Sequence, residues 1–556
     1  MTSSFPRLTE AALGKIPCDL LLKNVKYFDV FSCRWVSGDI AIVDGHIVGV
    51  EPGLKAKKTV NGKGRKLVPG FIDAHVHIES SLMVPQDFQN VVLPRGTTTA
   101  VCDPHEITNV IGVEGLKYFL ESSTRLGMDL RVMLSSCVPA THMETNGGGE
   151  VKASDLVALA AHPKALGLAE MMNIPGVLHG DPIVWDKLHA FQGGNIDGHC
   201  PLLSGKELSA YAISGVSSCH ESSSAPEAAE KLRKGISCWI REGSVAKDLE
   251  ALAPLLTLAT STSMGFCTDD RNPLDIAEEG HIDHLIRGAI RSGVSIEVAY
   301  RAASWSVARH YGMKRVGAIA PGYRADLVLL GDARRCEIEQ VWKSGIAVED
   351  LNIESLTAPT FANTVRTTLP AAEDLRGPEG RVHVIGVKRG KIITEHLVGD
   401  SKDRGVSRLS VLERYGRGSR PANGYARGFG KLNGAIASSV GHDSHNLIVV
   451  GADPVDMRAA LASLIECGGG FSVVKNGEVQ ARLALPFGGL MSGAGAKSIA
   501  GSLRKLHKAS SAIGCELPEP FLQLAFLSLP VIPSLKLTDR GLVDVEQFKI
   551  IGVSAG

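Results

Sequence analysis

Two histidines one residue apart end an apolar segment near the start of the chain. Residues 71–77 read Phe-Ile-Asp-Ala-His-Val-His and follow a Pro-Gly pair. Because successive side chains of a strand alternate between its faces, His75 and His77 point to the same side and can reach one metal ion. An isolated His-x-His more often combines a packed histidine with a solvated one. Ligand-type residues later in the chain favour the metal site here.

Several later apolar runs also end in residues that bind metals. These residues are Glu170, His199, His220 and the adjacent pair Asp269 and Asp270. A lone histidine after a strand is more often structural, but the whole set, joined to His75 and His77, has the imidazole and carboxylate composition of a divalent hydrolytic site. The carboxylate of Glu170 can bridge two ions. The sequence therefore predicts a binuclear centre.

Such a centre would activate water. Metal coordination lowers the pKa of water from about 15.7 to about 7, which makes hydroxide available as a nucleophile. Asp269 or Asp270 is expected to take a proton from this water and pass it to the leaving group. Glu221, directly after His220, is a second candidate for proton transfer, and a surface or helix-capping role is an equally good interpretation of it.

The elements that must position these residues are strands. Apolar strand-like runs alternate with helical stretches from residue 67 to residue 311. This alternation predicts parallel βα units in an α/β fold, and its length of about 240 residues is typical of a TIM-type (β/α)8 barrel, whose catalytic face lies at the C-terminal ends of the strands. The clearest strand-like runs are residues 98–102, 130–135, 165–169 and 264–268. We assign residues 69–311 to this metallo-hydrolase barrel.

Regions with β-type patterns flank the barrel. Short apolar runs before and after it predict one small β-domain divided between residues 1–68 and 312–365, with a tight Asp44-Gly45 turn. Residues 366–556 are expected to form an additional C-terminal α/β domain, which includes a helix at 455–464. Glycines and arginines interleave over residues 415–430, which predicts a loop.

The composition excludes several classes of function. The 556 residues include 59 Lys and Arg and 59 Asp and Glu, and no segment concentrates positive charge for a phosphate backbone. No apolar run approaches the roughly 18 residues of a membrane span, and the first residues lack the apolar core of a secretory signal. We expect a cytoplasmic protein with a small-molecule substrate and no nucleic-acid or membrane partner. The 11 cysteines form no Cys-x-x-Cys pair, so we expect reduced, mostly buried thiols.

Longer motifs around these residues resemble the amidohydrolase superfamily and, within it, the adenine deaminase family, over almost the whole chain. Among them are Asp-Ala-His-Val-His-Ile-Glu-Ser-Ser at 73–81, Cys-Asp-Pro-His-Glu-Ile at 102–107, Leu-Ala-Glu-Met-Met-Asn at 168–173 and Cys-Thr-Asp-Asp-Arg at 267–271. The run Gly-Ala-Ile-Ala-Ser-Ser-Val-Gly-His-Asp-Ser-His-Asn at 434–446 resembles the hallmark of that family's C-terminal domain. Simpler barrel amidohydrolases lack this run, so it favours the narrower family.

The resemblance implies hydrolysis of adenine to hypoxanthine and ammonia, a step of purine salvage, by a metal-bound hydroxide that attacks C6 of the ring. It implies two Mn²⁺ ions per chain, with Fe²⁺ or Zn²⁺ also compatible with the ligands, and a homodimer. The ligands that it implies are His75, His77, Glu170, His199, His220 and the last-strand aspartate, Asp269.

Two further polar groups are expected either to bind the substrate or to hold another ion. They are Asp103, His105 and Glu106 after the second strand, and His442, Asp443 and His445 in the C-terminal domain. A cluster at a helix start explains the first group equally, because acidic residues favour that end, and a turn before a strand explains the second.

The sequence departs from the family pattern at a few positions. Cys219 stands where an aspartate is common, Asn272 where a histidine often follows Asp-Asp-Arg, and residues 142–149 diverge. None of the departures falls on an expected ligand. They change residues around the ligands. Two alternatives stay open: an amidohydrolase of another aminated heterocycle or a cyclic amide, and a catalytically silent relative that serves as an assembly module. The intact ligand set argues against the silent relative.

Overall fold

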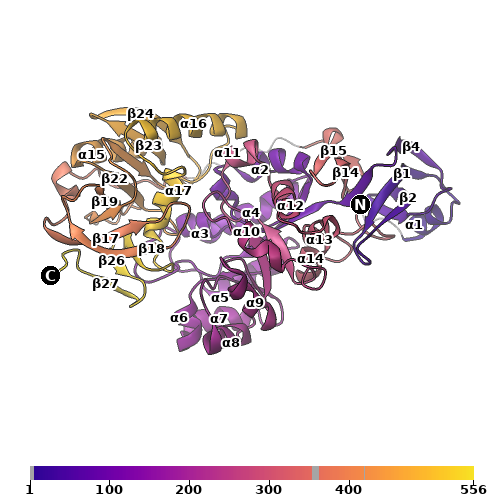
Figure 1. The fold of residues 1–556 in the computed structure, drawn as a ribbon, viewed down its shortest axis with the longest axis horizontal. Coiled ribbons are helices and arrows are strands. Elements are labelled where there is room, and N and C mark those ends of the chain that lie inside the picture. The colour runs from indigo at the N-terminus through magenta and orange to yellow at the C-terminus, as the bar shows by residue number, and fades with distance from the viewer. Residues whose placement is uncertain (1–4, 354–361, 419) are drawn as a thin grey trace.

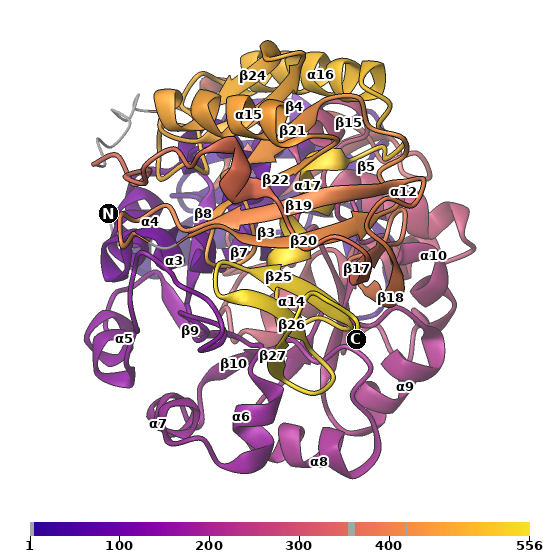
Figure 2. The same cartoon turned by 90° about the vertical axis from the view of Figure 1, so that its left-hand side faces the viewer.

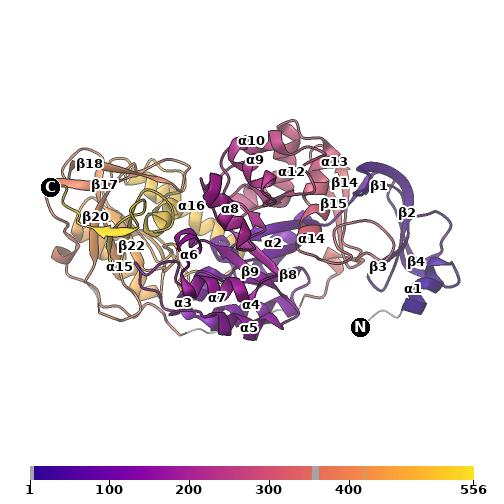
Figure 3. The same cartoon turned by 90° about the horizontal axis from the view of Figure 1, so that it is seen from below.

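Three regions lie in a row along the molecule, as the computed structural model shows for residues 5–353, 362–418 and 420–556 (Figure 1). The N-terminal sheet forms one end, an α/β region occupies the centre, and the C-terminal region forms the other end. Figure 3 shows the same order from below. Within the described ranges, no helix is long and apolar enough to cross a membrane.

The central region is built on two parallel sheets. One has the strand order β10-β9-β8-β7-β6 and the other β11-β12-β13. The strands are β6 (Phe71–Val76), β7 (Thr97–Cys102), β8 (Asp129–Leu134), β9 (Ala165–Met171), β10 (Asn195–Gly198), β11 (Ser218–Cys219), β12 (Ser237–Arg241) and β13 (Met264–Cys267). The sheets meet where Val76 forms a parallel bridge with Asp269, and β10 contacts β11 at the other edges. The predicted parallel α/β arrangement is thus present as a curled sheet.

Helices follow most of these strands and surround them (Figure 1). The helix α12 shows why they pack there: Ile282, Leu285, Ile286 and Ala289 recur at helical spacing and are all buried. The helices are α2 (Pro85–Val92), α3 (His105–Ile111), α4 (Val113–Arg125), α5 (Ala153–Ala160), α6 (Ile174–His179), α7 (Pro182–Ala190), α8 (Gly205–Ile213), α9 (Ala225–Arg233), α10 (Leu249–Leu252), α11 (Pro273–Glu278), α12 (Ile282–Arg291), α13 (Ile296–Ala302) and α14 (Trp305–His310).

The N-terminal sheet takes strands from both sides of the central region. Its order is β16-β15-β14-β5-β1-β2-β3, with β4 beside β1. Asp44 and Gly45 join β2 to β3 with positive φ angles of 48° and 75°, as the predicted tight turn requires. The elements are α1 (Phe5–Ala12), β1 (Cys18–Asp29), β2 (Arg34–Val43), β3 (His46–Gly49), β4 (Ala56–Asn61), β5 (Lys66–Pro69), β14 (Leu327–Asp332), β15 (Glu337–Lys343) and β16 (Ile346–Ala347).

The C-terminal region contains an eight-stranded sheet in the order β18-β17-β20-β19-β22-β21-β23-β24 (Figure 2). Three shorter strands, β25 (Leu535–Thr538), β26 (Gly541–Asp544) and β27 (Lys549–Ile551), form a second sheet. The other elements are β17 (Arg381–Val387), β18 (Thr394–Asp400), β19 (Val406–Leu412), β20 (Ala422–Arg427), β21 (Ala435–Ser438), β22 (Leu447–Gly451), α15 (Pro454–Cys467), β23 (Gly470–Lys475), β24 (Glu478–Ala484), α16 (Ala496–Ala512) and α17 (Pro520–Ala525).

One element of this region corrects the prediction from sequence. Residues 415–430 were expected to form a loop, but β20 lies within them and pairs with β19 on one side and β17 on the other. The glycines and arginines of this segment favoured the prediction of a loop. Pairing with the two neighbouring strands stabilises a strand there instead. The predicted helix at 455–464 is confirmed by α15, and all 11 cysteines are free thiols, most of them buried.

A cluster of ion pairs ties the N-terminal sheet to the central region. Arg324 approaches Asp129 of β8 and Asp326 beside β14, each at 2.6 Å, and Lys343 of β15 approaches Asp326 at 2.8 Å. Burial alone would raise the pKa of Asp129, but Arg324 and the neighbouring lysines hold it well below its usual value. Both carboxylates are therefore charged and depend on their cationic partners.

Replacement of Arg324 by alanine should destabilise the protein by about 2–3 kcal/mol, because it removes the cation shared by two buried carboxylates. Urea unfolding measures the change. Arg335→Ala is the matched control, since Arg335 pairs with Asp332 on the surface. An Arg324→Ala midpoint no lower than that of the control would contradict the structural role of this cluster.

Candidate metal centre and its pocket

The two histidines of the His-x-His motif lie together at the end of β6. Their Nε2 atoms are 3.0 Å apart, and both rings are almost fully buried. The Nδ1–H of His77 donates to the carbonyl oxygen of Asp103 at 2.9 Å, which directs Nε2 towards His75. Burial and the nearby His220 hold the pKa of His75 well below its usual value.

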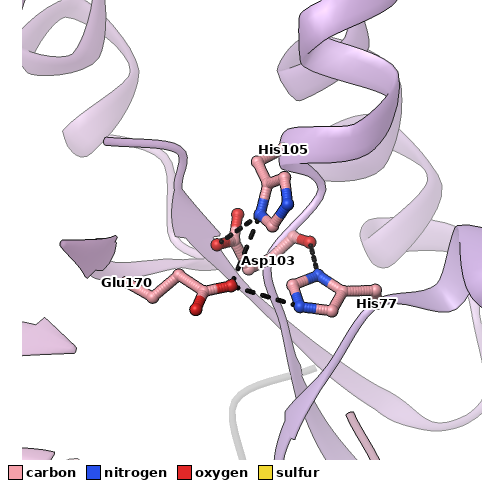
Figure 4. A group of neighbouring side chains, drawn as sticks. All are labelled: His77, Asp103, His105 and Glu170. Carbon is pink, nitrogen blue, oxygen red and sulfur yellow. Dashed lines mark hydrogen bonds and ion pairs between the residues drawn. The ribbon is translucent and has the colours of Figure 1, made fainter. Parts of the chain in front are cut away.

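Glu170, at the end of β9, sits between two pairs of histidines. Its Oε1 lies 3.2 Å from His77 Nε2 and 3.6 Å from His75 Nε2. Its Oε2 lies 2.7 Å from His199 Nδ1 and 3.3 Å from His220 Nε2. Each carboxylate oxygen therefore faces a different pair of imidazoles, which is the geometry of a bridging ligand. Figure 4 shows the side of Glu170 that faces His77.

Asp269 completes the group from the end of β13. Its Oδ1 lies 3.2 Å from His77 Nε2 and 3.6 Å from His75 Nε2. Asp270 is also near this group and accepts a hydrogen bond from Ser80. Burial, together with the charge of Asp269, raises the pKa of Asp270 to about 6.

The residues present fit a divalent cation. Overlapping groups of imidazole nitrogens and carboxylate oxygens lie within 4.8 Å of one another: His77, Asp103, His105 and Glu170; His75, His220 and Asp269; Glu170, His199 and His220. The buried Nε2 of His199 has no hydrogen-bond partner in the described structure, so this nitrogen is free to bind a metal ion. Such mixed N and O ligation without a thiolate suits Mn²⁺, Fe²⁺ or Zn²⁺.

Arg241 is a functional residue to which the sequence analysis gave no role. It is fully buried at the end of β12, and its guanidinium lies against Glu221, 3.1 Å from Asp269 Oδ2 and 3.0 Å from Asp248 Oδ2. The position of Arg241 at the end of a strand of the central region was the feature from which the sequence could have indicated a role for it. Arg241 therefore fixes the orientation of Asp269, and it also lines the pocket described below.

The interpretation of Glu221 as a surface residue is wrong. Its side chain is buried and contacts Arg241, with His199 Nδ1 at 3.8 Å and His220 Nε2 at 3.6 Å. Burial alone would raise the pKa of Glu221, but Arg241 and the two histidines hold it below its usual value. Glu221 is thus a charged group at the edge of the candidate centre.

The candidate centre opens into a pocket lined by both polar and apolar side chains. His77, Glu170, His199, His220 and Asp269 line one side of it. The apolar side chains in its wall are Met172, Val245, Ala246, Ile392, Phe526, Leu529 and Ile532. Ile392, Phe526, Leu529 and Ile532 come from the C-terminal region, and no local pattern in the sequence indicated that they would meet the strands of the central region.

The two further polar groups are brought together at the same pocket. His105, Glu106, His442 and Asp443 line it, although they are separated by more than 300 positions in the chain. His105 and Glu106 do lie at the start of a helix, because α3 begins at His105. Both residues nevertheless line the pocket. Asp103 lies behind His105, and His445 lies behind Glu106.

The departures from the family pattern have structural partners. The thiol of Cys219 is 3.5 Å from Cys200 Sγ and 3.5 Å from the ammonium of Lys231. Asn272 caps α11 by accepting from the amides of Leu274 and Asp275, and it donates to Glu519 in the C-terminal region. Both positions therefore carry polar contacts adjacent to the candidate ligands.

Known proteins match this chain along its length. Residues 67–348 match the Amidohydrolase family, and residues 386–549 match the Adenine deaminase C-terminal domain. A protein of Rhizobium johnstonii named Adenine deaminase 1 is 49% identical over 566 aligned positions, covering 99% of each chain. A protein of Cereibacter sphaeroides named Adenine deaminase is 50% identical, covering 99% of this chain and 100% of its own.

The solved structure of an N-acetyl-D-glucosamine-6-phosphate deacetylase from Mycobacterium smegmatis aligns with a TM-score of 0.45 and 15% identity, covering 59% of this chain and 99% of that chain. The full-length identity to curated relatives and the two domain matches agree with the motifs in the sequence. The chain belongs to the adenine deaminase family of the amidohydrolases.

Proposed function

We propose that this protein hydrolyses adenine to hypoxanthine and ammonia, as a step of purine salvage. The observation that carries the proposal is the cluster around Glu170, which faces a pocket with an apolar wall. Relatives named adenine deaminase, matched over 99% of the chain, support the choice of substrate.

Two divalent ions are proposed to be held by six side chains, with Mn²⁺ first and Fe²⁺ or Zn²⁺ also compatible. These side chains are His75, His77, Glu170, His199, His220 and Asp269. The ions would supply an activated water and electrophilic assistance. Glu170 supports the choice of two ions, because its oxygens face separate histidine pairs, and two-metal sites hold their ions about 3.5–4 Å apart.

Proton transfer is proposed to involve the aspartates at the end of β13. Asp269 is engaged by His77 and Arg241 and would act as a ligand. Asp270 lines the pocket without a cationic partner of this kind and is placed to carry a proton to the departing amine, which is too basic to leave unprotonated. Glu221, paired with Arg241, is the third candidate.

The purine is proposed to lie between the candidate centre and the apolar wall. Phe526, Ile392 and Ile532 offer flat and aliphatic surface on one side, where burial of ring atoms is favourable. His105, Glu106, His442 and Asp443 lie where polar ring edges would point. Asp103 and His445 would act through these neighbours.

The whole architecture is proposed to be a closed (β/α)8 barrel with two added domains. Ile72 of β6, Met133 of β8, Ala169 of β9 and Trp239 of β12 belong to one apolar cluster, as side chains inside a barrel would. The proposed domains are residues 1–68 with 312–365, residues 69–311, and residues 366–556. Residues 354–361 of the second segment lie outside the described structure. A homodimer, a cytoplasmic location and the absence of nucleic-acid and membrane partners stay predictions.

The test of the function is ammonia release from adenine by protein expressed with added Mn²⁺. Adenosine and guanine serve as control substrates. Turnover of adenine alone supports the proposal. Bound metal without adenine turnover would favour another aminated heterocycle or a cyclic amide, and the absence of both would favour a silent relative.

Replacement of Glu170 by glutamine should lower metal content and reduce turnover of adenine by more than about 100-fold. Loss of residues that only orient ligands costs about 10–100-fold, so loss of a bridging ligand should cost more. Metal analysis and the ammonia assay measure both effects. Glu278→Gln, an exposed position, is the control. Wild-type metal content and turnover in Glu170→Gln would remove this residue from the site.

Replacement of Arg241 by methionine should lower kcat and kcat/KM together by about 10–100-fold, because Arg241 positions Asp269. Arg241→Lys, which restores one positive charge, should recover part of the loss. Steady-state kinetics with adenine provide the measurement. A rise in KM with unchanged kcat would show instead that Arg241 acts in substrate binding.

A further inference from the structure

A second convergence of donor atoms lies beside the same pocket. His105 and Glu106 come from the start of α3, and His442 and Asp443 come from the turn before β22. His442 Nδ1 lies 2.7 Å from Glu106 Oε1, and His105 Nε2 lies 3.5 Å from the same oxygen. Asp443 Oδ1 lies 3.7 Å from both His105 Nε2 and His442 Nδ1.

These spacings are those of ligands around one ion. Metal–ligand bonds of roughly 2.0–2.2 Å in a tetrahedron place neighbouring ligand atoms about 3.4 Å apart. The contacts from 2.7 to 3.7 Å fall around this value. One atom of His105, Glu106 and Asp443 lies within 4.8 Å of the others, as in a metal site. The donor atoms of His105, Glu106 and Asp443 therefore lie close enough to share one ion, and His442 Nδ1 lies beside two of them.

Unpartnered atoms are the second observation. Two buried atoms of the cluster, Asp443 Oδ2 and His442 Nε2, make no hydrogen bond in the described structure, while the oxygens of Glu106 face the imidazole nitrogens of His442 and His445. Glu106 and Asp443 are each 2% exposed, so water does not satisfy them at the surface. Buried polar groups are rarely left in this condition unless they hold a ligand.

The groups behind the cluster orient its donors. The Nδ1–H of His105 donates to Asp103 Oδ2 at 3.0 Å, which leaves the Nε2 electron pair directed at the cluster (Figure 4). Asp103 Oδ1 in turn accepts from Ser135 at 3.1 Å. A carboxylate that fixes the tautomer of a histidine in this way is a regular companion of metal ligands.

His445 supports Glu106 from the opposite side. The amide of Gly441 donates to His445 Nδ1 at 3.3 Å, so in a neutral ring Nε2 carries the hydrogen. That nitrogen lies against Glu106 Oε2, the oxygen that does not face His442. All six residues of the two polar groups therefore belong to one connected cluster of side chains.

We propose that His105, Glu106, His442 and Asp443 bind a further divalent cation, through Nε2, Oε1, Nδ1 and Oδ1 respectively. The site is separate from the one around Glu170, because it uses none of those ligands. The nitrogen of His105 that faces Glu170, Nδ1 at 3.5 Å, is the one that donates to Asp103. Two imidazoles and two carboxylates suit Mn²⁺, Fe²⁺ or Zn²⁺.

Such an ion would have two consequences. It would link the central region to the C-terminal region at the pocket, since two ligands come from each. It would also present a positive charge to the pocket, where these four residues form part of the lining. The C-terminal region would then contribute to the chemistry of the site as well as to its apolar wall.

The test compares metal content between the wild-type protein and two variants, His442→Ala and Asp443→Asn. Each metal-free protein is dialysed against Mn²⁺, and bound ions per chain are counted by mass spectrometry. We expect one ion fewer in each variant, while a Glu170→Gln protein keeps the ion bound at His442. Circular dichroism verifies folding, and Asp443→Asn preserves side-chain volume in case His442→Ala does not fold.

His507→Gln is the control, because His507 lies on α16 of the same region and contacts Glu519 instead of this cluster. It should bind as many ions as the wild-type protein. Equal metal counts in the wild-type, His442→Ala and Asp443→Asn proteins would overturn the proposal. Because the readout is the difference in bound metal, it stands whether or not adenine is the substrate.

Discussion

The burial of many ionisable side chains at one end of the central sheets is the constraint on which the site depends. His75, His77, Glu170 and Asp269 are nearly inaccessible to water, and moving charges from water into such surroundings is costly unless they are paired or bind a cation. The protein meets part of this requirement with Arg241, which pairs with Asp269, and the remaining imidazoles and carboxylates have the composition that fits a divalent cation.

The C-terminal region matters because the central region does not enclose the pocket by itself. Phe526, Leu529 and Ile532 cover the candidate centre with apolar surface, and His442 and Asp443 meet the start of α3. Lys536 reinforces this wall, since its buried ammonium donates to the carbonyl oxygens of Ile392 and Phe526. A wall of this kind excludes water and strengthens the electrostatic interactions inside the pocket. Loss of this region would leave the ligands exposed to solvent.

The placement of ligands at strand ends explains why the sequence was informative about the site. A side chain just beyond a strand has its direction set by the alternation of the strand, so His75 and His77 had to face the same way. The curled sheet then brings separate strand ends together, and Glu170 and Asp269 approach the same histidines from positions far along the chain. Local pattern and regular topology together were sufficient to predict that these side chains would converge.

The sequence by itself determined the parallel α/β core, the residues that converge at its strand ends, the family and the split of the N-terminal sheet. Each of these depends on local periodicity or on motifs that stay contiguous in the chain. Only the tertiary structure decided that Arg241 supports Asp269, that Glu221 is buried, that residues 422–427 form a strand, and that Glu106 meets His442. These facts depend on contacts between segments distant in sequence, where packing and burial, which no local pattern records, select the partner of each side chain.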